Sequence, residues 1–268
     1  MTDLRAHFGF HTEPCTREIP VQHHLRLPQY DEALEGLRDA VQRRQSAALI
    51  APAGTGKTQV VRALADQLPE ARYRVRYVKV TDLSKRDMCR EIACAAGCEP
   101  RGTYNGLVRA LQARFSDHVD VDGLRPVLVL DEAHDMRADV LGILRVLTNF
   151  DYDSRLVLSI VLVGQPELAA MLRRPQLEAV ARRMAHYATL RPLSRDETVQ
   201  YVKHRCVVAG ATDVPFDAGA LDAIHEIGGG NLRAIDRLVG KSLLLAARAD
   251  AKAVDTTHIV SARRVLWP

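Results

Sequence analysis

The chain has 268 residues, of which 47% are hydrophobic and 26% are charged, so it is long enough to build one large or two modest domains around apolar cores. No apolar stretch approaches the ~20 residues that a membrane-spanning helix needs, and the first residues lack the apolar centre of a signal peptide. We therefore expect a folded cytoplasmic protein that makes no membrane contact. The formal net charge of +4 permits contact with nucleic acid but does not require it.

The five cysteines are odd in number and sparse, which favours a reducing compartment. Cys89, Cys94 and Cys98 raise the alternative of a metal site. However, Cys89 and Cys94 fall within one helical pattern, and neither a Cys-x-x-Cys pair nor a nearby histidine completes a ligand set. We expect these thiols to be structural.

Segments typical of strands and helices alternate along the chain as far as Leu193, after a loop-like N-terminal arm that ends before Pro28. The segments that are apolar throughout are typical of central parallel strands. The alternation predicts a parallel α/β sheet with both faces covered by helices. Strands are predicted at 47–50, 74–80, 126–130, 156–163 and 186–190, and helices at 59–66, 85–96, within 101–115 and at 137–147.

After Pro192 only helices are predicted. Ser194-Arg-Asp-Glu197 matches a capping box that opens a helix to about Ala209, and Gly210 suits the C-cap. Further helices are predicted at 218–227, at 232–247 after three glycines, and up to 265 after a cap at Asp255 or Thr256. We therefore expect an N-terminal arm at 1–27, an α/β domain at 28–193 and a small all-α domain at 194–268.

The stretch from Ala51 to Thr58 reads Ala-Pro-Ala-Gly-Thr-Gly-Lys-Thr and lies between a predicted strand and a predicted helix. This context is typical of a phosphate-binding loop, in which backbone N–H groups and a helix N-terminus surround the phosphates. Lys57 is expected to reach the β- and γ-phosphates, and the Thr58 hydroxyl to ligate Mg²⁺.

One position departs from the phosphate-loop pattern, because Ala51 replaces the first glycine. Glycine is needed only where φ is positive or where the backbone must approach a ligand closely. We expect the replacement to matter little if Ala51 has ordinary strand-end dihedral angles, since Gly54 and Gly56 keep their freedom.

The run Val127-Leu-Val-Leu-Asp-Glu-Ala-His134 places two carboxylates at the end of an apolar strand. Ligands bind at that edge of a parallel sheet. Asp131 is expected to hold Mg²⁺ through water together with Thr58, and Glu132 to orient or deprotonate the attacking water. The alternative is a strand followed by a polar helix start. The presence of both motifs in one α/β pattern favours a nucleotide site.

Gly-Lys-Thr, Asp-Glu-Ala-His and a helical C-terminal part together resemble the AAA+ ATPases, and more specifically the ExeA/TniB/TnsC-like group, which includes transposition helper ATPases. The resemblance implies a P-loop parallel-sheet AAA+ domain that binds nucleotide, followed by a small all-α lid domain. Within it, the Gly-Gln-Pro-Glu-Leu run is the most specific. The closer similarity is carried by Phe8-Gly-Phe10, Leu147-Thr-Asn-Phe-Asp151, Val161-Leu-Val-Gly-Gln-Pro-Glu-Leu168, Leu190-Arg-Pro-Leu193 and Gly229-Gly-Asn-Leu-Arg233.

The resemblance also implies roles for further residues. Gln165 fits the sensor position that reads the γ-phosphate, and Arg233 the second sensor. Arg182 or Arg183 fits an arginine finger that reaches the nucleotide of a neighbouring subunit, where such a finger can supply ~10³–10⁵ in rate. The alternatives are a polar turn residue at Gln165 and solvated surface arginines. Asn149 is expected to support the sensor region.

The predicted cofactors are ATP and Mg²⁺. The catalytic set is Glu132, Lys57, Gln165, Arg182, Arg183 and Arg233; the nucleotide-binding set is Pro52, Ala53, Gly54, Thr55, Gly56, Lys57, Thr58, Gln59 and Arg233; and the metal ligands are Thr58 and Asp131.

Three functions fit such an ATPase. The first is a transposition helper whose ATP-bound subunits assemble as a ring or filament on double-stranded DNA and recruit a transposase and other transposition proteins. The candidate DNA-contacting residues lie at 74–79, at Lys85-Arg86 and near Arg101. The second is an ExeA-like secretion-assembly ATPase, ranked lower because no membrane segment or wall-binding module is found. The third is a slowly hydrolysing nucleotide-switch adaptor; the intact Lys57, Asp131 and Glu132 argue against a total loss of hydrolysis.

Overall fold

The computed structural model of the chain describes residues 4–16 and 18–267, which pack as two compact units. The α/β unit comprises residues 28–52 and 57–190. The helical unit comprises the chain up to Leu27, residues 53–56 and the chain from Arg191. The segment predicted as a separate N-terminal arm therefore packs with the C-terminal helices.

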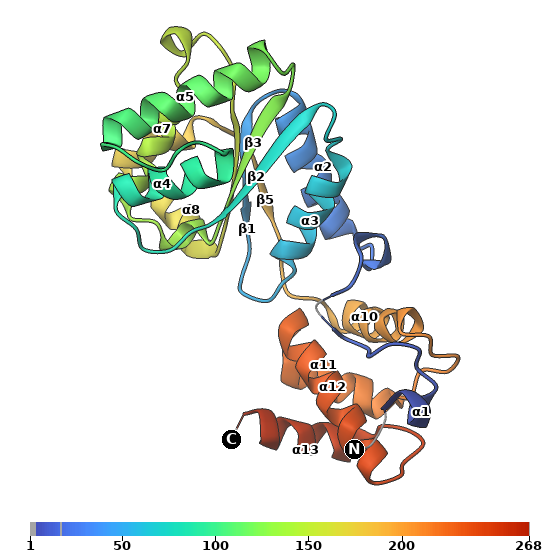
Figure 1. Cartoon of the computed structure of the whole chain (residues 1–268). Helices are drawn as coiled ribbons and strands as arrows, with labels where there is room; N and C mark the ends of the chain where they lie inside the picture. The colour runs from blue at the N-terminus through green and yellow to red at the C-terminus, as the bar shows by residue number, and fades with distance from the viewer. Residues whose placement is uncertain (1–3, 17, 268) are drawn as a thin grey trace. The chain divides into compact units, whose positions relative to one another are not determined.

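The α/β unit is built on a five-stranded parallel sheet in the order β2-β3-β4-β1-β5 (Figure 1). Strands β1, β3 and β4 lie inside the sheet and are almost wholly buried, which explains their apolar sequences. This confirms the predicted fold class. The strands are β1 (Ser46–Ile50), β2 (Tyr73–Lys79), β3 (Arg125–Asp131), β4 (Ser159–Gly164) and β5 (Met184–Thr189).

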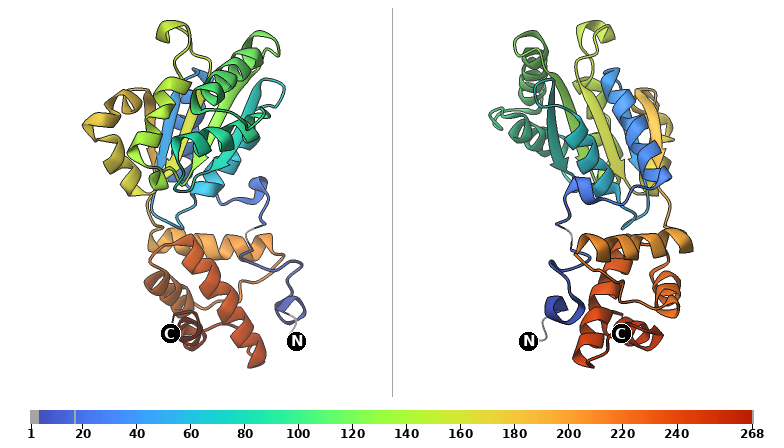
Figure 2. Two further views of the ribbon diagram at one scale, coloured as in Figure 1. Left: turned by 60° about the vertical axis from the view of Figure 1, so that its left-hand side comes forward. Right: turned by 90° about the vertical axis from the view of Figure 1, so that its right-hand side faces the viewer.

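Helices cover both faces of the sheet. Helices α2 (Pro28–Gln42) and α3 (Lys57–Gln67) lie on one face, and α4 (Lys85–Ala96), α5 (Tyr104–Asp120), α7 (Ile143–Leu147) and α8 (Pro166–Leu172) on the other (Figures 1 and 2). Alternate residues of the inner strands β1, β3 and β4 enter the two cores, because side chains alternate along a strand. Helix α2 was not predicted, although its buried residues follow a helical period.

The connections on the second face are more broken than the sequence suggested. The predicted helix at 137–147 is two short helices, α6 (Ala138–Leu141) and α7, which meet at Gly142. Strand β4 begins three residues later than predicted, because Phe150 and Arg155 pair around a short 3-10 turn. Three further short helices are η2 (Ala133–Asp135), η4 (Pro175–Leu177) and α9 (Glu178–Ala181).

The helical unit holds four long C-terminal helices and part of the arm. Ser194 Oγ accepts a hydrogen bond from the Glu197 N–H, and Glu197 accepts one from the Ser194 N–H, so the predicted capping box is confirmed. Asp255 caps the last helix. The arm was expected to be irregular, yet it contains a short helix, α1. The helices are α1 (Leu4–Phe8), η1 (Val21–His23), α10 (Arg195–Val208), α11 (Ala218–Gly228), α12 (Leu232–Arg248) and α13 (Thr256–Leu266).

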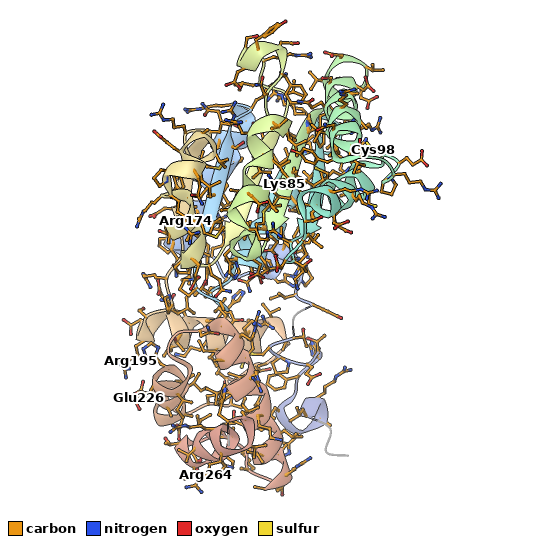
Figure 3. The ribbon with its side chains drawn as sticks, turned by 90° about the vertical axis from the view of Figure 1, so that its left-hand side faces the viewer. Lys85, Cys98, Arg174, Arg195, Glu226 and Arg264 are labelled. Carbon is orange, nitrogen blue, oxygen red and sulfur yellow. The ribbon has the colours of Figure 1, made fainter. Side chains whose placement is uncertain are left out.

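The three clustered cysteines do not form one group. Cys89 is buried in α4, Cys94 is exposed on the same helix, and Cys98 lies just beyond it (Figure 3). Among the described residues, no three or more His, Cys, Asp or Glu side chains come together as a metal site. None of the helices in the described ranges is long and apolar enough to span a membrane.

Candidate nucleotide-binding site

The phosphate loop leaves β1 through Ala51. Its N–H group donates to the Gly164 carbonyl at 3.0 Å, so Ala51 extends the parallel ladder, and its methyl group is 1% exposed in the core beside α3. Its φ is not positive, whereas Gly54 and Gly56 have φ of 75° and 100°. The condition under which alanine replaces the first glycine without strain is therefore met.

Lys57 begins α3 and is 8% exposed. Its Nζ donates hydrogen bonds to the Ala51 and Pro52 carbonyls at 2.9 and 3.0 Å. Because a buried ammonium group needs acceptors, these carbonyls hold it at the loop, where phosphate oxygens would serve as further acceptors. Thr58 is the second residue of α3 and is exposed, which leaves its hydroxyl accessible to a metal ion.

Residues 53–56 of the loop are held within the helical unit. The Asn231 side chain donates to the Ala53 carbonyl at 2.6 Å, and the Leu232 N–H donates to the Gly54 carbonyl at 2.8 Å. A Cβ atom on Gly54 would lie 2.3 Å from Asn231 Oδ1. Close approach as well as positive φ therefore requires glycine at this position.

Asp131 ends β3 and is 8% exposed. Its Oδ1 accepts a hydrogen bond from the Glu132 N–H at 2.9 Å, and its Oδ2 accepts one from the Tyr77 hydroxyl at 2.6 Å. Partial burial and the hydrogen bond to Asp131 raise the pKa of Tyr77, which keeps this hydroxyl a donor. The carboxylate is thus fixed at both oxygens before any ligand binds.

Tyr77 was missed by the sequence reasoning. It lies on β2, whose Lys79 is paired with Asp131, so Tyr77 is on the same face of the sheet as that carboxylate. The alternation of side chains along β2 placed Tyr77 on one face of that strand. Only the register between β2 and β3, however, shows that Asp131 lies on the same face.

Glu132 follows with φ 57° and ψ 35°, the left-handed conformation that is uncommon outside glycine. Its side chain is 33% exposed, but its Oε2 atom is buried and accepts no hydrogen bond within the described structure. Such a conformation persists only when the surroundings enforce it, and it is typical of functional sites. A carboxylate oxygen without a donor is what a general base needs to take a proton from water.

Gln165 follows β4 directly and precedes α8. In the sheet β4 lies between β3 and β1, so the strand order places Gln165 between the end of β3 at Asp131 and the start of the phosphate loop. Its side-chain Nε2 is 2.6 Å from His134 Nε2, and His134 Nδ1 is 3.6 Å from Glu132 Oε2. The structure therefore brings Glu132, His134 and Gln165 together, and His134 was not singled out from the sequence.

The two finger candidates differ in their surroundings. The Arg182 side chain is 79% exposed and pairs with Glu178 at 2.6 Å, one helical turn earlier. The Arg183 side chain is 23% exposed; its Nε donates to Thr148 Oγ1 at 2.9 Å and its Nη2 to Asp153 at 2.5 Å. Arg183 is therefore bonded within the α/β unit, whereas the Arg182 side chain is largely exposed despite its pair with Glu178.

Two further expectations concern Arg233 and Asn149. Arg233 lies at the start of α12 and is exposed, without a hydrogen bond or ion pair to any described residue. Asn149 lies before β4, and its carbonyl accepts from Gln112 on α5. Since Gln165 leaves the opposite end of that strand, Asn149 does not support the sensor region, and this expectation was wrong.

The residues at the sheet edge fit a nucleotide with Mg²⁺. Mg²⁺ prefers oxygen ligands and takes few of them from the protein, the rest coming from phosphates and water. Thr58 and Asp131 offer a hydroxyl and a carboxylate, and each carboxylate oxygen of Asp131 accepts only one of the hydrogen bonds given above.

Comparisons with known proteins place the chain in a family. Over 205 residues it is 37% identical to General secretion pathway protein A of Aeromonas hydrophila, which covers 75% of this chain and 37% of that protein. The chain thus spans little more than a third of that relative's length.

Solved structures share the fold at low sequence identity. Cdc6p from Pyrobaculum aerophilum matches with a TM-score of 0.75 at 18% identity, over 94% of this chain and 70% of that one. The ORC1 protein of Aeropyrum pernix, in complex with DNA, matches with a TM-score of 0.66 at 18% identity, over 92% of this chain and 68% of that one. Residues 38–172, which contain the phosphate loop, Asp131–Glu132 and Gln165, match the family described as AAA domain, and the chain therefore belongs to that family.

Proposed function

We propose that the chain hydrolyses ATP at the edge of the sheet formed by the phosphate loop and Asp131–Glu132. Lys57 neutralises the β- and γ-phosphates, and residues 52–59 of the loop and α3 bind the nucleotide. Thr58 and Asp131 hold Mg²⁺, which when bound neutralises charge on the phosphates. Glu132 accepts the proton of the attacking water, and the observation that carries this role is its side chain, which follows the end of β3 at 33% exposure and whose Oε2 atom lacks a donor.

Three residues complete the site in this proposal. Gln165 senses the γ-phosphate from its place between the two motifs. Arg233, which has no described partner, is the second sensor. Arg182 is the better finger candidate because it is exposed, whereas Arg183 is engaged within its own subunit. A finger that reaches the nucleotide of a neighbouring subunit acts across an interface, so the proposal includes a homo-oligomer.

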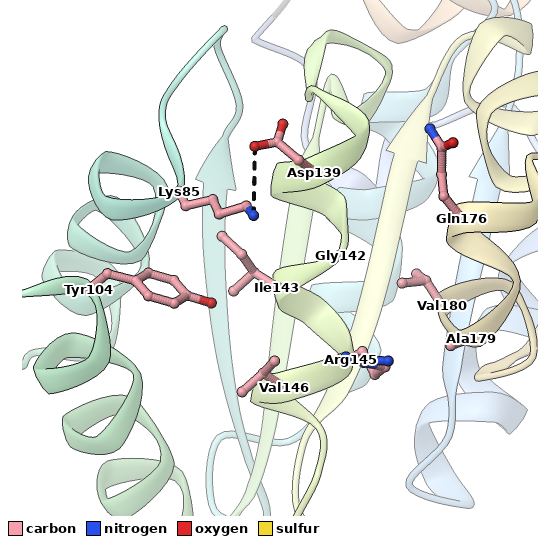
Figure 4. A pocket seen from close by; sticks show the side chains of 10 residues that line it. All are labelled: Lys85, Tyr104, Asp139, Gly142, Ile143, Arg145, Val146, Gln176, Ala179 and Val180. Carbon is pink, nitrogen blue, oxygen red and sulfur yellow. Dashed lines mark ion pairs between the residues drawn. The ribbon is translucent and has the colours of Figure 1, made fainter.

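We further propose that this oligomer assembles on double-stranded DNA. The candidate DNA-contacting residues differ in whether they already have a partner within the chain. Lys85 lies 3.8 Å from Asp139, and both residues line a pocket beside α7 (Figure 4). Arg86 Nε donates to the Gly102 carbonyl at 3.0 Å, and Arg101 lies 3.7 Å from Glu99. Within the described residues, Arg74 and Arg76 have no such partner.

Arg74 and Arg76 belong to a larger cluster. They lie on one face of β2, an edge strand of the sheet, and Arg114 on α5 is their neighbour. The Nε atoms of all three are buried without a hydrogen bond to a described residue. Burial lowers the pKa of Arg76, and the charges of Arg74 and Arg114 lower it further.

This mutual repulsion is relieved by an anion, and guanidinium groups match phosphate oxygens particularly well. Phosphates of the DNA backbone supply such anions without sequence readout. The ORC1 structure in complex with DNA supports the proposal by likeness of fold alone.

The biological role that we favour is regulation of transposition, through target selection or transposase recruitment. It is supported by the Gly-Gln-Pro-Glu-Leu run and by the cluster of Arg74, Arg76 and Arg114, which suits the phosphates of DNA. A second candidate, assembly of a secretion apparatus, is favoured by the 37% identity to General secretion pathway protein A. Because the chain spans 37% of that protein, the lack of a membrane segment or wall-binding module in this stretch does not discriminate between the two roles. A slowly hydrolysing nucleotide switch is the third candidate.

The test is assembly of the purified chain with Mg²⁺, duplex DNA and either ATP, a non-hydrolysable analogue or ADP, observed by electron microscopy. We expect rings or filaments only with ATP or its analogue. If no assembly forms at any protein concentration while phosphate is still released, the DNA role is wrong and the ATPase remains. If neither is seen, the ATPase proposal also fails. Neighbouring genes for an integrase-like transposase, or for secretion proteins, then discriminate between the two biological roles.

A further inference from the structure

His134 lies between the proposed base and the proposed sensor. Its ring is 11% exposed, with Nδ1 3.6 Å from Glu132 Oε2 and Nε2 2.6 Å from the Gln165 side-chain amide. In addition, the Gln165 backbone N–H lies 3.4 Å from His134 Nδ1. The ring therefore contacts Gln165 twice, once through each nitrogen.

These two contacts restrict the tautomer of the ring. A neutral imidazole carries one N–H donor and one acceptor nitrogen. If Nδ1 accepts from the Gln165 backbone N–H, then Nε2 carries the hydrogen and is a donor. The group of the Gln165 side chain facing Nε2 must then be its carbonyl oxygen, which a half-turn of the terminal torsion exchanges with the amide nitrogen.

We propose that His134 is a positioning residue that selects which end of the Gln165 amide faces the nucleotide. With Nε2–H donating to the carbonyl oxygen, the Gln165 NH₂ group points away from the ring. Because the strand order places Gln165 between Asp131 and the phosphate loop, this NH₂ group is offered to the γ-phosphate. With the opposite tautomer of the ring, the Gln165 NH₂ group would face Nε2 and the Gln165 carbonyl oxygen would face the γ-phosphate, which repels it.

The inference rests on the proposed ATPase function, and it predicts discrimination between tri- and diphosphate. A hydrogen bond to a charged group contributes enough to change an affinity about 10-fold or more. His134→Ala frees the amide to turn, so the preference for a triphosphate over ADP should fall by the same factor as in Gln165→Ala. His134→Gln places an amide NH₂ group near the Nε2 position and should restore most of the preference.

The experiment measures binding of a non-hydrolysable ATP analogue and of ADP, with Mg²⁺, to the full chain and to His134→Ala, His134→Gln, Gln165→Ala and the double alanine variant. We expect about a 10-fold loss of preference in either alanine variant, no further loss in the double variant, and unchanged ADP affinity. Unchanged ADP affinity also shows that the variants are folded.

Three outcomes overturn the proposal: His134→Ala keeps the wild-type preference, the losses of the two alanine variants add, or ADP and triphosphate affinities fall together and His134→Gln restores neither. The last is the result of a purely structural role. Failure of the ATPase proposal is distinguishable, because the wild-type chain itself would then release no phosphate from ATP.

Discussion

The hydroxyl of Tyr77 donates a 2.6 Å hydrogen bond to Oδ2 of Asp131, from the edge strand of the sheet to the strand that ends in the paired carboxylates. Tyr77 is 50% exposed on the edge strand β2, whereas the carboxylate that it contacts is nearly buried. In an AAA domain with the proposed Mg²⁺ chemistry, the orientation of that carboxylate decides how the metal ion is held.

Tyr77→Phe is therefore expected to weaken use of Mg²⁺. Without the hydroxyl, Oδ2 of Asp131 loses its donor and the carboxylate can rotate, so the Mg²⁺ concentration for half-maximal ATP hydrolysis should rise several-fold. Tyr187→Phe is a matched control, because Tyr187 lies on β5, at the opposite edge of the sheet, and its hydroxyl donates to the Ala181 carbonyl of α9. Equal Mg²⁺ titrations of wild type and Tyr77→Phe would show that the hydrogen bond has no such role.

Glu132→Gln is expected to keep nucleotide binding and to slow hydrolysis by about 10²–10⁴-fold, since the amide cannot accept the proton of water. Assembly on DNA with ATP should become longer-lived, because the triphosphate state persists. Phosphate release and dissociation rates measure the two effects. Glu167→Gln, an exposed glutamate in the first turn of α8, is the control and should behave as wild type. Turnover that survives in Glu132→Gln assigns the base elsewhere.

The sequence was sufficient for the sheet, the phosphate loop and Asp131, because buried parallel strands are apolar runs whose ends hold the ligand. It was insufficient for Tyr77 and His134. The role of Tyr77 depends on the register between β2 and β3, and that of His134 on the contacts its ring makes from η2, and the sequence alone defines neither. Asn149 was misplaced for a related reason: it is near Gln165 in sequence, but a strand carries the chain across the whole sheet between them.

Replacement of Arg74, Arg76 and Arg114 by alanine should weaken DNA binding and make it less sensitive to salt. Each phosphate neutralised contributes about 0.9 to the slope of log affinity against log salt, so the slope should become shallower by about 3. Arg101→Ala is the matched control, since Arg101 already faces Glu99. Fluorescence anisotropy with duplex DNA over a salt series measures both. If Arg101→Ala weakens DNA binding more than the triple variant does, the DNA contact lies near Arg101 instead.

Arg182→Ala and Arg183→Ala should fail in different ways. Arg183→Ala loses its hydrogen bonds to Thr148 and Asp153, which should lower the free energy of unfolding by about 1–2 kcal/mol. Arg182→Ala should leave stability unchanged and reduce hydrolysis only in the assembled protein.

Mixing tests the finger directly. Arg182→Ala subunits keep an intact nucleotide site, and Lys57→Ala subunits keep an intact finger, so a mixture of the two inactive variants should recover part of the ATPase activity. A mixture that stays inactive, although the two variants co-assemble, argues against Arg182 as the finger.

Ala51→Gly tests the departure from the phosphate-loop pattern. The Ala51 methyl group is 1% exposed and packs in the core beside α3, and its φ needs no glycine. Glycine would remove one buried methyl group and add backbone freedom to the unfolded chain. The free energy of unfolding should therefore fall by about 1–2 kcal/mol. Nucleotide affinity should be unchanged, because Gly54 and Gly56 supply the positive φ values. Gly56→Ala is the opposite case, and we expect it to weaken nucleotide binding. Urea denaturation measures the stability of both variants, and nucleotide titration measures their affinity. Together they distinguish an alanine that packs in the core from a glycine that shapes the loop.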